Sequence, residues 1–339
     1  MNDRKSRRRR EPSMANVADV AGVSHQTVSR VLNGSALVRA DTRDRVLAAI
    51  SDLGYRRNTA ARELATNRSG RLGVIAAHLG LYGPSMIANA VQEAGYDAGY
   101  HVSLVGLPEI THDTLRGAAD RLLDQSSEGI IVAVAHREGL ALAESLKPGI
   151  PVVVVEGVVA GGPWTAGVDQ QLGARLATRH LLELGHESVA FVGGPQEWIE
   201  SVARRAGWQA EHVAAGKRVG PELVGNWSAA SGYEAGKALS RSGATAVFVA
   251  NDHMALGVLC ALREAGLRVP EDISVVGFDD LPEAAYFSPP LTTVHQDFAE
   301  LGRRAIDVIV RALDGESRPS SELVNPALVV RASTRSPVK

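Results

Sequence analysis

From residue 72 onward, short apolar runs alternate with segments of helical spacing. The runs cover residues 72–77, 101–107, 129–134, 151–157, 188–194, 245–252 and 273–280. Near-continuous apolar runs are typical of parallel strands that are buried on both faces. Strands that alternate with helices predict a parallel sheet with helices on both sides. Because the alternation is long for one sheet, we predict two similar α/β subdomains, first joined near residues 161–167.

Polar side chains stand where several of these runs end. Glu156 ends one run, Asn251 and Asp252 end another, and Asp279 and Asp280 end a third. In open α/β sheets, ligands bind beyond the carboxyl ends of the strands. We therefore predict a polar ligand cleft in which the two subdomains face each other.

Charge is divided unevenly along the chain. Residues 1–70 hold 14 Lys and Arg against 7 Asp and Glu, whereas the remainder holds 22 against 31, within a net charge of −2. A basic head on an acidic body indicates that only the head meets a polyanion. The arginine run at residues 7–10 also fits a solvated tail, so charge alone leaves both interpretations open.

The basic head carries the pattern of short helices separated by a glycine turn. Apolar residues at i, i+3, i+4 and i+7 predict the first helix, and they are Met14, Val17, Ala18 and Ala21. Gly22 then ends this helix, and Ser24 can cap the next one. A third helix is predicted from about Thr42, with Gly54 as its end.

The second helix has an apolar face and a hydrogen-bonding face. Its buried stripe consists of Val28, Val31 and Leu32. The side chains that project from the opposite face are His25, Gln26, Ser29 and Arg30. Gln can pair with adenine and Arg with guanine in the major groove, so this pattern fits a DNA-binding helix-turn-helix. Spacing alone also fits a three-helix bundle with an ordinary polar face.

Several stretches closely resemble LacI/GalR-family transcriptional regulators. In the head these are residues 21–34, 41–55 and 58–65. In the body the motifs are LYGPSMI (81–87), RRAGW (204–208), NWSAASGY (226–233), VANDHMALG (249–257), SVVGFDD (274–280) and PPLTTVHQDF (289–298). The resemblance implies an N-terminal all-α helix-turn-helix domain and an α/β periplasmic-binding-protein-like body of two Rossmann-like subdomains.

The same resemblance implies domain boundaries. A basic disordered arm (1–12) precedes a helix-turn-helix domain (13–57), a hinge helix with its linker (58–70), and an effector-binding and dimerisation domain (71–339). Within the last, one subdomain spans about 71–168 and 298–325, and the other spans about 169–297 and 326–339. A helix as short as the hinge is marginal in water, so it needs a packing partner.

By resemblance, base reading falls to His25, Gln26 and Arg30. The positions expected to contact phosphate, sugar or the adjoining backbone are Ser24, Thr27, Ser29, Asn33, Tyr55 and Asn58. Leu64 matches a leucine that wedges into the minor groove, and Ala60 and Ala61 are small enough for close approach. Arg57 departs from the family pattern, which commonly has proline there.

The resemblance also implies a sugar site in the cleft. Its hydroxyl-binding positions are Arg204, Asn251, Asp279 and Gln296, its stacking position is Trp227, and its apolar wall is Leu81, Pro84, Ile87 and Phe298. Glu156 stands where an aspartate is expected, and the loop at residues 108–109 replaces an arginine. The implied effector is a small sugar, a β-galactoside or a related disaccharide.

We therefore predict a homodimeric repressor that binds a palindromic double-stranded operator and loses affinity when sugar binds. Three alternatives stay open: a regulator that needs its ligand to bind DNA, an exported sugar-binding protein, and an α/β enzyme with Asp279 and Asp280 as acid and base. Export would need a signal that the sequence lacks. No leucine heptads follow Val330, which favours a dimer over a tetramer.

Composition and motifs argue against several other classes. The single cysteine, Cys260, excludes a disulfide framework and a cysteine zinc cluster. No apolar run approaches the ~18 residues that cross a membrane. Nucleotide-binding, nucleophile-elbow and zinc-protease motifs are missing. We expect a cytoplasmic, non-enzymatic protein with no cofactor, no metal and no membrane partner.

Overall fold

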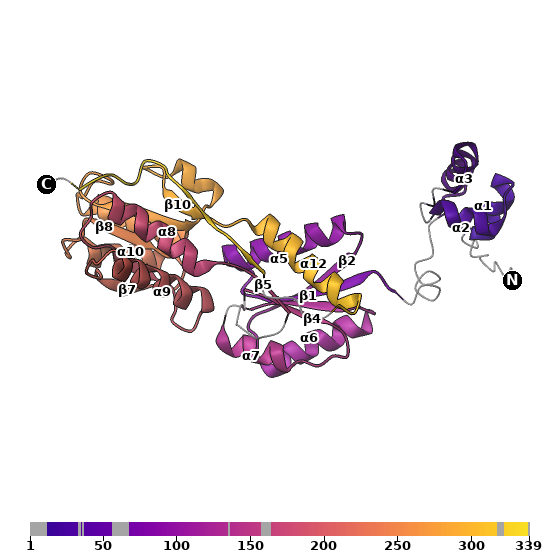
Figure 1. Ribbon diagram of the computed structural model, residues 1–339, viewed down its shortest axis with the longest axis horizontal. Coiled ribbons are helices and arrows are strands. Elements are labelled where there is room, and N and C mark those ends of the chain that lie inside the picture. Colours follow the sequence, from indigo (N-terminus) through magenta and orange to yellow (C-terminus); the bar gives the residue numbers. More distant parts are fainter. Residues whose placement is uncertain are drawn as a thin grey trace, which may run out of the picture. The chain divides into compact units, whose positions relative to one another are not determined.

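A computed structural model describes residues 12–32, 35, 37–55, 68–134, 136–156, 164–316 and 322–337. The chain divides into two compact units, Met1–Ser69 and Gly70–Lys339, which are considered separately below (Figure 1). The predictions made for the N-terminal arm up to residue 11, and for Asn33, Asn58, Ala60, Ala61 and Leu64, lie outside the described residues.

The first unit contains the three predicted helices. They are α1 (Met14–Ala21), α2 (His25–Leu32) and α3 (Ala40–Leu53). The backbone N–H of Thr27 donates to Ser24 Oγ over 3.1 Å, so Ser24 caps α2 as predicted. Gly22 (φ 63°) and Gly54 (φ 60°) end α1 and α3 in the left-handed conformation that glycine adopts readily. Val17, Val28 and Val46, one from each helix, are fully buried and form the centre of the unit's core.

The second unit contains two six-stranded sheets. The first has the order β11-β5-β4-β3-β1-β2, with every neighbouring pair parallel. Its strands are β1 (Arg71–Ala77), β2 (His101–Leu107), β3 (Gly129–Ala133), β4 (Val152–Val155), β5 (Trp164–Val168) and β11 (Glu322–Val324). We call this sheet with its helices the first lobe.

Helices cover both faces of the first sheet, because side chains of β1 point alternately to its two sides. Leu72 and Val74 pack with α5 (Tyr82–Asp97) and α12 (Phe298–Leu313). Ile75 packs on the opposite face with α6 (His112–Asp124) and α7 (Arg137–Ser145). Figure 1 shows these two helix layers on either side of the sheet.

The second sheet and its helices form the second lobe. Its order is β12-β10-β9-β8-β6-β7, and only the β10–β12 pair is antiparallel among its described pairs. Its strands are β6 (Ala190–Gly193), β7 (Glu222–Val224), β8 (Ala246–Val249), β9 (Ser274–Asp279), β10 (Thr292–His295) and β12 (Ala327–Val329). Its helices are α8 (Gln170–Glu183), α9 (Ile199–Ala214), α10 (Ala229–Leu239), α11 (Asp252–Glu264) and the 3₁₀ turn Pro282–Tyr286.

The chain passes between the lobes three times: from β5 to α8, from β10 to α12, and from β11 to β12. The first two passages share a local device. Asp169 caps α8 by accepting from the backbone N–H of Leu172 over 2.8 Å, and Asp297 caps α12 by accepting from that of Glu300 over 2.8 Å. Each helix on the far side of a passage is thus fixed at its first turn.

Two sequence-based predictions differ from the structure. The first passage was expected near residues 161–167, but Trp164–Val168 forms strand β5, and the chain crosses after it. Because glycine is typical of turns, the glycines of this region led the sequence analysis to expect a connection where the chain forms a short strand. β2 was expected to be buried on both faces, but it lies at the edge of its sheet, where Leu104 is 37% exposed.

The strands otherwise follow the predicted apolar runs, and the predicted fold class is confirmed. β12 matches the C-terminal strand that the family resemblance implies for the second subdomain. β5, β7, β10 and β11 were not predicted as strands, because β7 and β11 have only three residues and β5 and β10 interrupt their apolar residues with glycine, threonine or histidine. Within the described residues, no helix is both long and apolar enough to cross a membrane.

Candidate functional site

A cavity of about 330 Å³ lies where loops and helix starts of the two lobes meet. This volume is in the range of small-molecule sites. The ten residues predicted for effector binding all line it: Leu81, Pro84, Ile87, Glu156, Arg204, Trp227, Asn251, Asp279, Gln296 and Phe298. The structure therefore brings the whole predicted set together, from both lobes.

The cavity has further lining residues that sequence reasoning missed. They are Gly80, Tyr82, Gly83, Gln170, Trp198, Glu200, Ser228, Ala229 and His253. Trp198 and Glu200 follow β6, so the rule that ligands bind beyond strand ends would have found them. Gln170 carried no such signal, because it is the first residue of a helix that follows an unpredicted strand.

Backbone conformation helps to place three of the lining side chains. Glu156 after β4 (φ 68°), Trp227 before α10 (φ 72°) and Asp279 at the end of β9 (φ 106°) all have positive φ. For residues other than glycine, such conformations cost about 1–3 kcal/mol each and gather at functional sites. The surrounding packing holds these residues where their side chains line the cavity.

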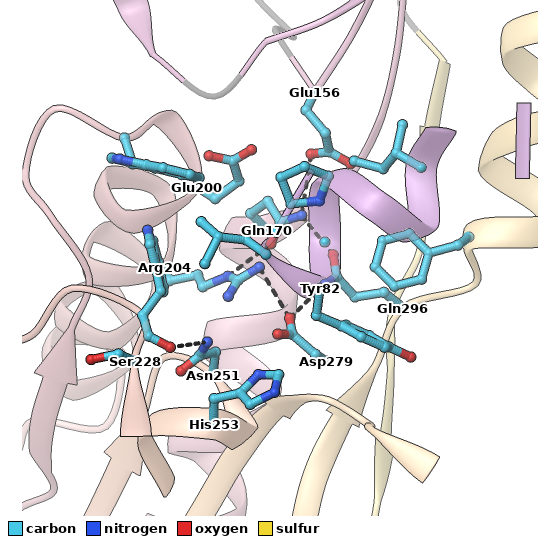
Figure 2. Close-up of a pocket in the computed structure, with 18 of the residues that line it drawn as sticks. Tyr82, Glu156, Gln170, Glu200, Arg204, Ser228, Asn251, His253, Asp279 and Gln296 are labelled. Carbon is cyan, nitrogen blue, oxygen red and sulfur yellow. Dashed lines mark hydrogen bonds and ion pairs between the residues drawn. The ribbon is translucent and has the colours of Figure 1, made fainter. Parts of the chain in front are cut away.

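A chain of hydrogen bonds crosses the floor of the cavity (Figure 2). Arg204 Nε donates to Gln170 Oε1 over 2.9 Å. Gln170 Nε2 donates to Glu156 Oε2 over 3.2 Å and to Gln296 Oε1 over 2.8 Å. Gln296 Nε2 donates to Asp279 Oδ1 over 2.8 Å, and Arg204 Nη2 lies 3.5 Å from the same oxygen. These bonds therefore fix polar groups of both lobes relative to one another.

Burial dominates the electrostatics of the cavity. It raises the pKa of Asp279 to about 6, although Arg204 and the hydrogen bond from Gln296 act in the opposite direction. It also raises the pKa of Glu156 to about 7. The pKa of Glu200 is raised to about 8, first by burial and then by the charge of Glu156. The carboxyl groups are thus poised to change protonation near neutral pH.

Aromatic rings form one wall of the cavity. Trp227 packs over Gly194, where a Cβ atom would lie 2.2 Å from the ring, so only glycine leaves room. Trp198 meets Trp227 edge-on at 5.5 Å between ring centroids. Trp227 is 7% exposed, and its Nε1 has no hydrogen-bond partner within the described structure. An indole N–H that is buried beside a cavity is available to a ligand acceptor.

A second contact joins the lobes beside the cavity. His136, in the first lobe, forms a backbone bridge with Trp198 in the second. The rings of His136 and His78 lie 4.8 and 5.3 Å from the Trp198 ring, and their Nε2 atoms are 3.2 Å apart. Burial, followed by the charge of His78, lowers the pKa of His136.

In the first unit, α2 presents most of the predicted DNA-contacting side chains to solvent. Ser24, His25, Gln26 and Arg30 are exposed. Thr27 and Ser29 are half-buried. Tyr55 differs, since its side chain packs in the core of the unit and is only 8% exposed. Any contact that Tyr55 makes with DNA is limited to this small exposed part.

Comparison with known proteins decides the family. A model of the lacI family of bacterial regulatory proteins matches residues 13–58, and one of a periplasmic binding protein-like domain matches residues 178–334. The lactose operon repressor of Escherichia coli (strain K12) is 35% identical, covering 96% of this chain and 91% of its own. The chain belongs to the LacI family.

Other members of the LacI family match over the same length. The transcriptional regulator CelR of Thermobifida fusca is 35% identical, and the repressor PurR of Pasteurella multocida (strain Pm70) is 32% identical. Both matches cover 96% of this chain and 99% of the relative. This LacI-family chain is therefore a DNA-binding transcriptional regulator with a ligand-binding domain, as the sequence motifs predicted.

Solved structures of LacI-family proteins have the same fold. The lac repressor dimer bound to operator and the anti-inducer ONPF matches with a TM-score of 0.81 and 33% identity, covering 96% of this chain and 99% of that one. A complex of CelR with cellobiose matches with a TM-score of 0.69 and 31% identity, covering 95% and 99%. Among the described residues, no group of three or more His, Cys, Asp or Glu side chains could hold a metal ion.

Proposed function

We propose that this protein is a homodimeric repressor whose operator affinity falls when a small sugar, a β-galactoside or a related disaccharide, occupies the cavity. The observation that carries this proposal is the cavity itself, which joins a fixed hydrogen-bonding floor to a tryptophan wall between two lobes. Saccharides need both features, because their hydroxyls pair with polar groups and their C–H faces pack on aromatic rings.

The polar floor supports recognition of hydroxyls. Asp279 and Glu156 offer acceptor oxygens, whereas Asn251 and the N–H groups of Arg204 that make no internal hydrogen bond offer donors. Asn251 Nδ2 already donates to the carbonyl of Trp227 over 3.1 Å, which ties a hydroxyl-binding position to the stacking ring. The relatives support the same ligand class: one is named as the lactose operon repressor, and CelR was solved with cellobiose.

The first unit supports sequence-specific DNA binding. We propose that residues 13–57 are the DNA-binding domain and that α2 enters the major groove with His25, Gln26 and Arg30 on the bases. Residues 58–70 would then be the hinge helix and linker, with Leu64 in the minor groove. The lac repressor was solved as a dimer on operator, and two copies of this chain would bind a palindromic site in the same way.

The mechanism links the cavity to the operator. Sugar binding closes the cleft between the lobes and separates the paired hinge segments, which then melt and withdraw their minor-groove contacts. The effector must therefore bind more tightly to the form that holds DNA poorly. By thermodynamic reciprocity, operator DNA must weaken sugar binding by the same factor.

Operator titration tests this proposal. An operator fragment is selected from a random duplex pool with the full-length protein, and its affinity is measured with and without lactose, cellobiose and a purine base. Reduced affinity with a disaccharide supports the proposal. Increased affinity identifies a regulator that needs its ligand to bind DNA, and unchanged affinity with every ligand rejects sugar induction.

The enzymatic alternative loses one of its two carboxylates. Asp280 is not among the residues that line the cavity. It pairs with Arg331 over 2.7 Å and with His295 over 3.1 Å. Asp280 is thereby occupied in a structural contact, which leaves Asp279 without the partner that acid–base catalysis was expected to use.

A further inference from the structure

The cavity holds more carboxyl groups than cationic groups. Among the described lining residues, Glu156, Glu200 and Asp279 are acidic, whereas Arg204 is the one Lys or Arg. The donors of Arg204 are already directed at Asp279, Gln170 and the carbonyl of Ala250. Arg204 therefore forms its ion pair with Asp279, and neither glutamate forms an ion pair with a cation in the described part of the chain.

Glu200 is the less satisfied of these two glutamates. It lies in the first turn of α9, where the helix dipole favours a negative charge. Its Oε2 atom is buried and has no hydrogen-bond partner among the residues that the structure describes. Glu156, by comparison, accepts from Gln170 and from the backbone N–H of Val168. A buried carboxyl oxygen without a partner beside a cavity indicates a place for a polar group of a ligand.

Glu156 and Glu200 come from different lobes and lie at the same end of the cavity (Figure 2). Glu156 follows β4 of the first lobe, and Glu200 belongs to α9 of the second. A cationic group placed between them would contact both lobes at once. It would also give Glu200 Oε2 the hydrogen-bond partner that the described residues do not supply.

We infer that the effector carries a protonated amine, so that it is an unacetylated amino sugar whose ammonium group lies between Glu156 and Glu200. This inference rests on the proposed function and names the ligand class of the same cavity. The ammonium group has three N–H donors and a compact charge, which suits two carboxylates. The sugar hydroxyls still bind to Arg204, Asn251 and Asp279, as in the proposed function.

An adjoining cavity adds to the negative potential. It has a volume of about 150 Å³ and shares Glu200, Pro84 and Ile87 with the first. Its other titratable lining residues are Glu109, Glu138, His78 and His136. Two of these residues, Glu109 and Glu138, are further carboxylates, and both are exposed.

The protonation of the glutamates gives the inference a distinct signature. Burial raises the pKa of Glu156 to about 7 and that of Glu200 to about 8, so both carboxyls tend to be protonated at about pH 6.5 before a ligand binds. An ammonium group stabilises their ionised forms and therefore displaces protons. A neutral sugar adds no charge and displaces none.

The test uses the full-length protein and calorimetry with four ligands: the β-1,4-linked glucosamine disaccharide, its N-acetylated form, cellobiose and putrescine. At about pH 6.5 we expect the amine disaccharide to bind at least about tenfold more tightly than cellobiose and to release about one proton. Proton release is measured by repeating the titration in buffers of different ionisation heat. The N-acetylated form should lose the advantage.

Two variants locate the effect. Glu200→Gln keeps the shape of the side chain and removes its charge, so it should abolish most of the preference for the amine disaccharide over cellobiose, measured as the ratio of the two affinities. Glu197→Gln is the matched control, because Glu197 lies three residues away, is exposed and does not line the cavity. It should behave as the unmodified protein.

The outcomes separate a failure of this inference from a failure of the proposed function. If cellobiose binds and lowers operator affinity but the amine gives no advantage and no proton release, the inference is wrong and the proposed function stands. If Glu200→Gln keeps the full preference, Glu200 is not the ammonium site and the inference is wrong. Putrescine binding as tightly as the disaccharide would contradict a sugar ligand, and binding of none of the four would reject inference and function together.

Discussion

Gln170 donates a hydrogen bond to Glu156 over 3.2 Å, so the first helix of the second lobe is tied to a strand end of the first. The same amide nitrogen also donates to Gln296, and the amide oxygen accepts from Arg204. One buried side chain therefore holds together groups that the proposed effector would contact. Its position beside a passage between the lobes makes it sensitive to their relative movement.

Replacing Gln170 with alanine should impair the response to sugar and spare DNA binding. Losing the amide leaves buried partners unsatisfied, at a cost of about 1–3 kcal/mol. We expect sugar affinity to fall by roughly tenfold or more, measured by calorimetry, with unchanged operator affinity. Gln171→Ala is the control, since Gln171 is the exposed neighbour. Equal effects of the two substitutions would contradict a role for the Gln170 side chain.

Trp227 should be needed for the ligand response rather than for folding of the chain. Trp227→Phe keeps a ring over Gly194 and should weaken sugar binding modestly, whereas Trp227→Ala should abolish the response and leave operator binding intact. Alanine also opens a void, which typically costs about 3–5 kcal/mol of folding stability. Circular dichroism and operator titration separate the two effects. Loss of both DNA binding and response would show that Trp227 is mainly a core residue.

Arg30 should read a base. We expect Arg30→Ala to cost about 1–3 kcal/mol of operator binding and to relax specificity at one position of each half-site. Selection from randomised duplexes measures this directly. Arg39→Ala removes the same charge from an exposed position outside α2. It should weaken binding evenly across sequences, and a matching pattern from both variants would argue against base reading by Arg30.

Leu64→Ala tests the proposed hinge. If Leu64 wedges into the minor groove, its loss should weaken specific binding and leave non-specific binding unchanged, because the wedge is used only on the bent operator. Circular dichroism should show an unchanged body. Equal loss on specific and random duplexes would contradict the wedge.

Stability should depend on pH through the cavity. A carboxyl whose pKa is raised on folding contributes stability below its unfolded pKa and loses it as pH rises through the folded pKa. For Glu200 this window runs from 4.5 to about 8. We therefore expect Glu200→Gln to raise the free energy of unfolding relative to the unmodified protein more at the upper end of this window than at the lower, measured by denaturant titration.

The histidines require the comparison to be made between variants. Burial lowers the pKa of His136, His180, His186 and His212. Their contribution to folding stability is therefore complete above their unfolded pKa of 6.5 and is lost as pH falls below it. These residues are the same in both proteins and cancel in the difference. Glu197→Gln should give a flat difference over the same range.

Sequence reasoning found the strand-end residues because a physical rule places them. Glu156, Asn251 and Asp279 follow apolar runs, and parallel strands bring their carboxyl ends to one edge. The same reasoning missed Gln170, which lies at the start of a helix behind a strand that glycines concealed. The sequence could not predict that Glu200 Oε2 has no partner among the described residues. This depends on where the folded chain directs the N–H groups of Arg204, which contact Gln170, Ala250 and Asp279.

Asp169 and Asp297 fix the first turns of α8 and α12 on the far sides of two passages, and a third passage returns the chain from β11 to β12. Because three covalent connections join the same two lobes, any displacement that pulls the lobes apart must stretch all three at once. A ligand that contacts both lobes is therefore expected to change the angle between them rather than their separation.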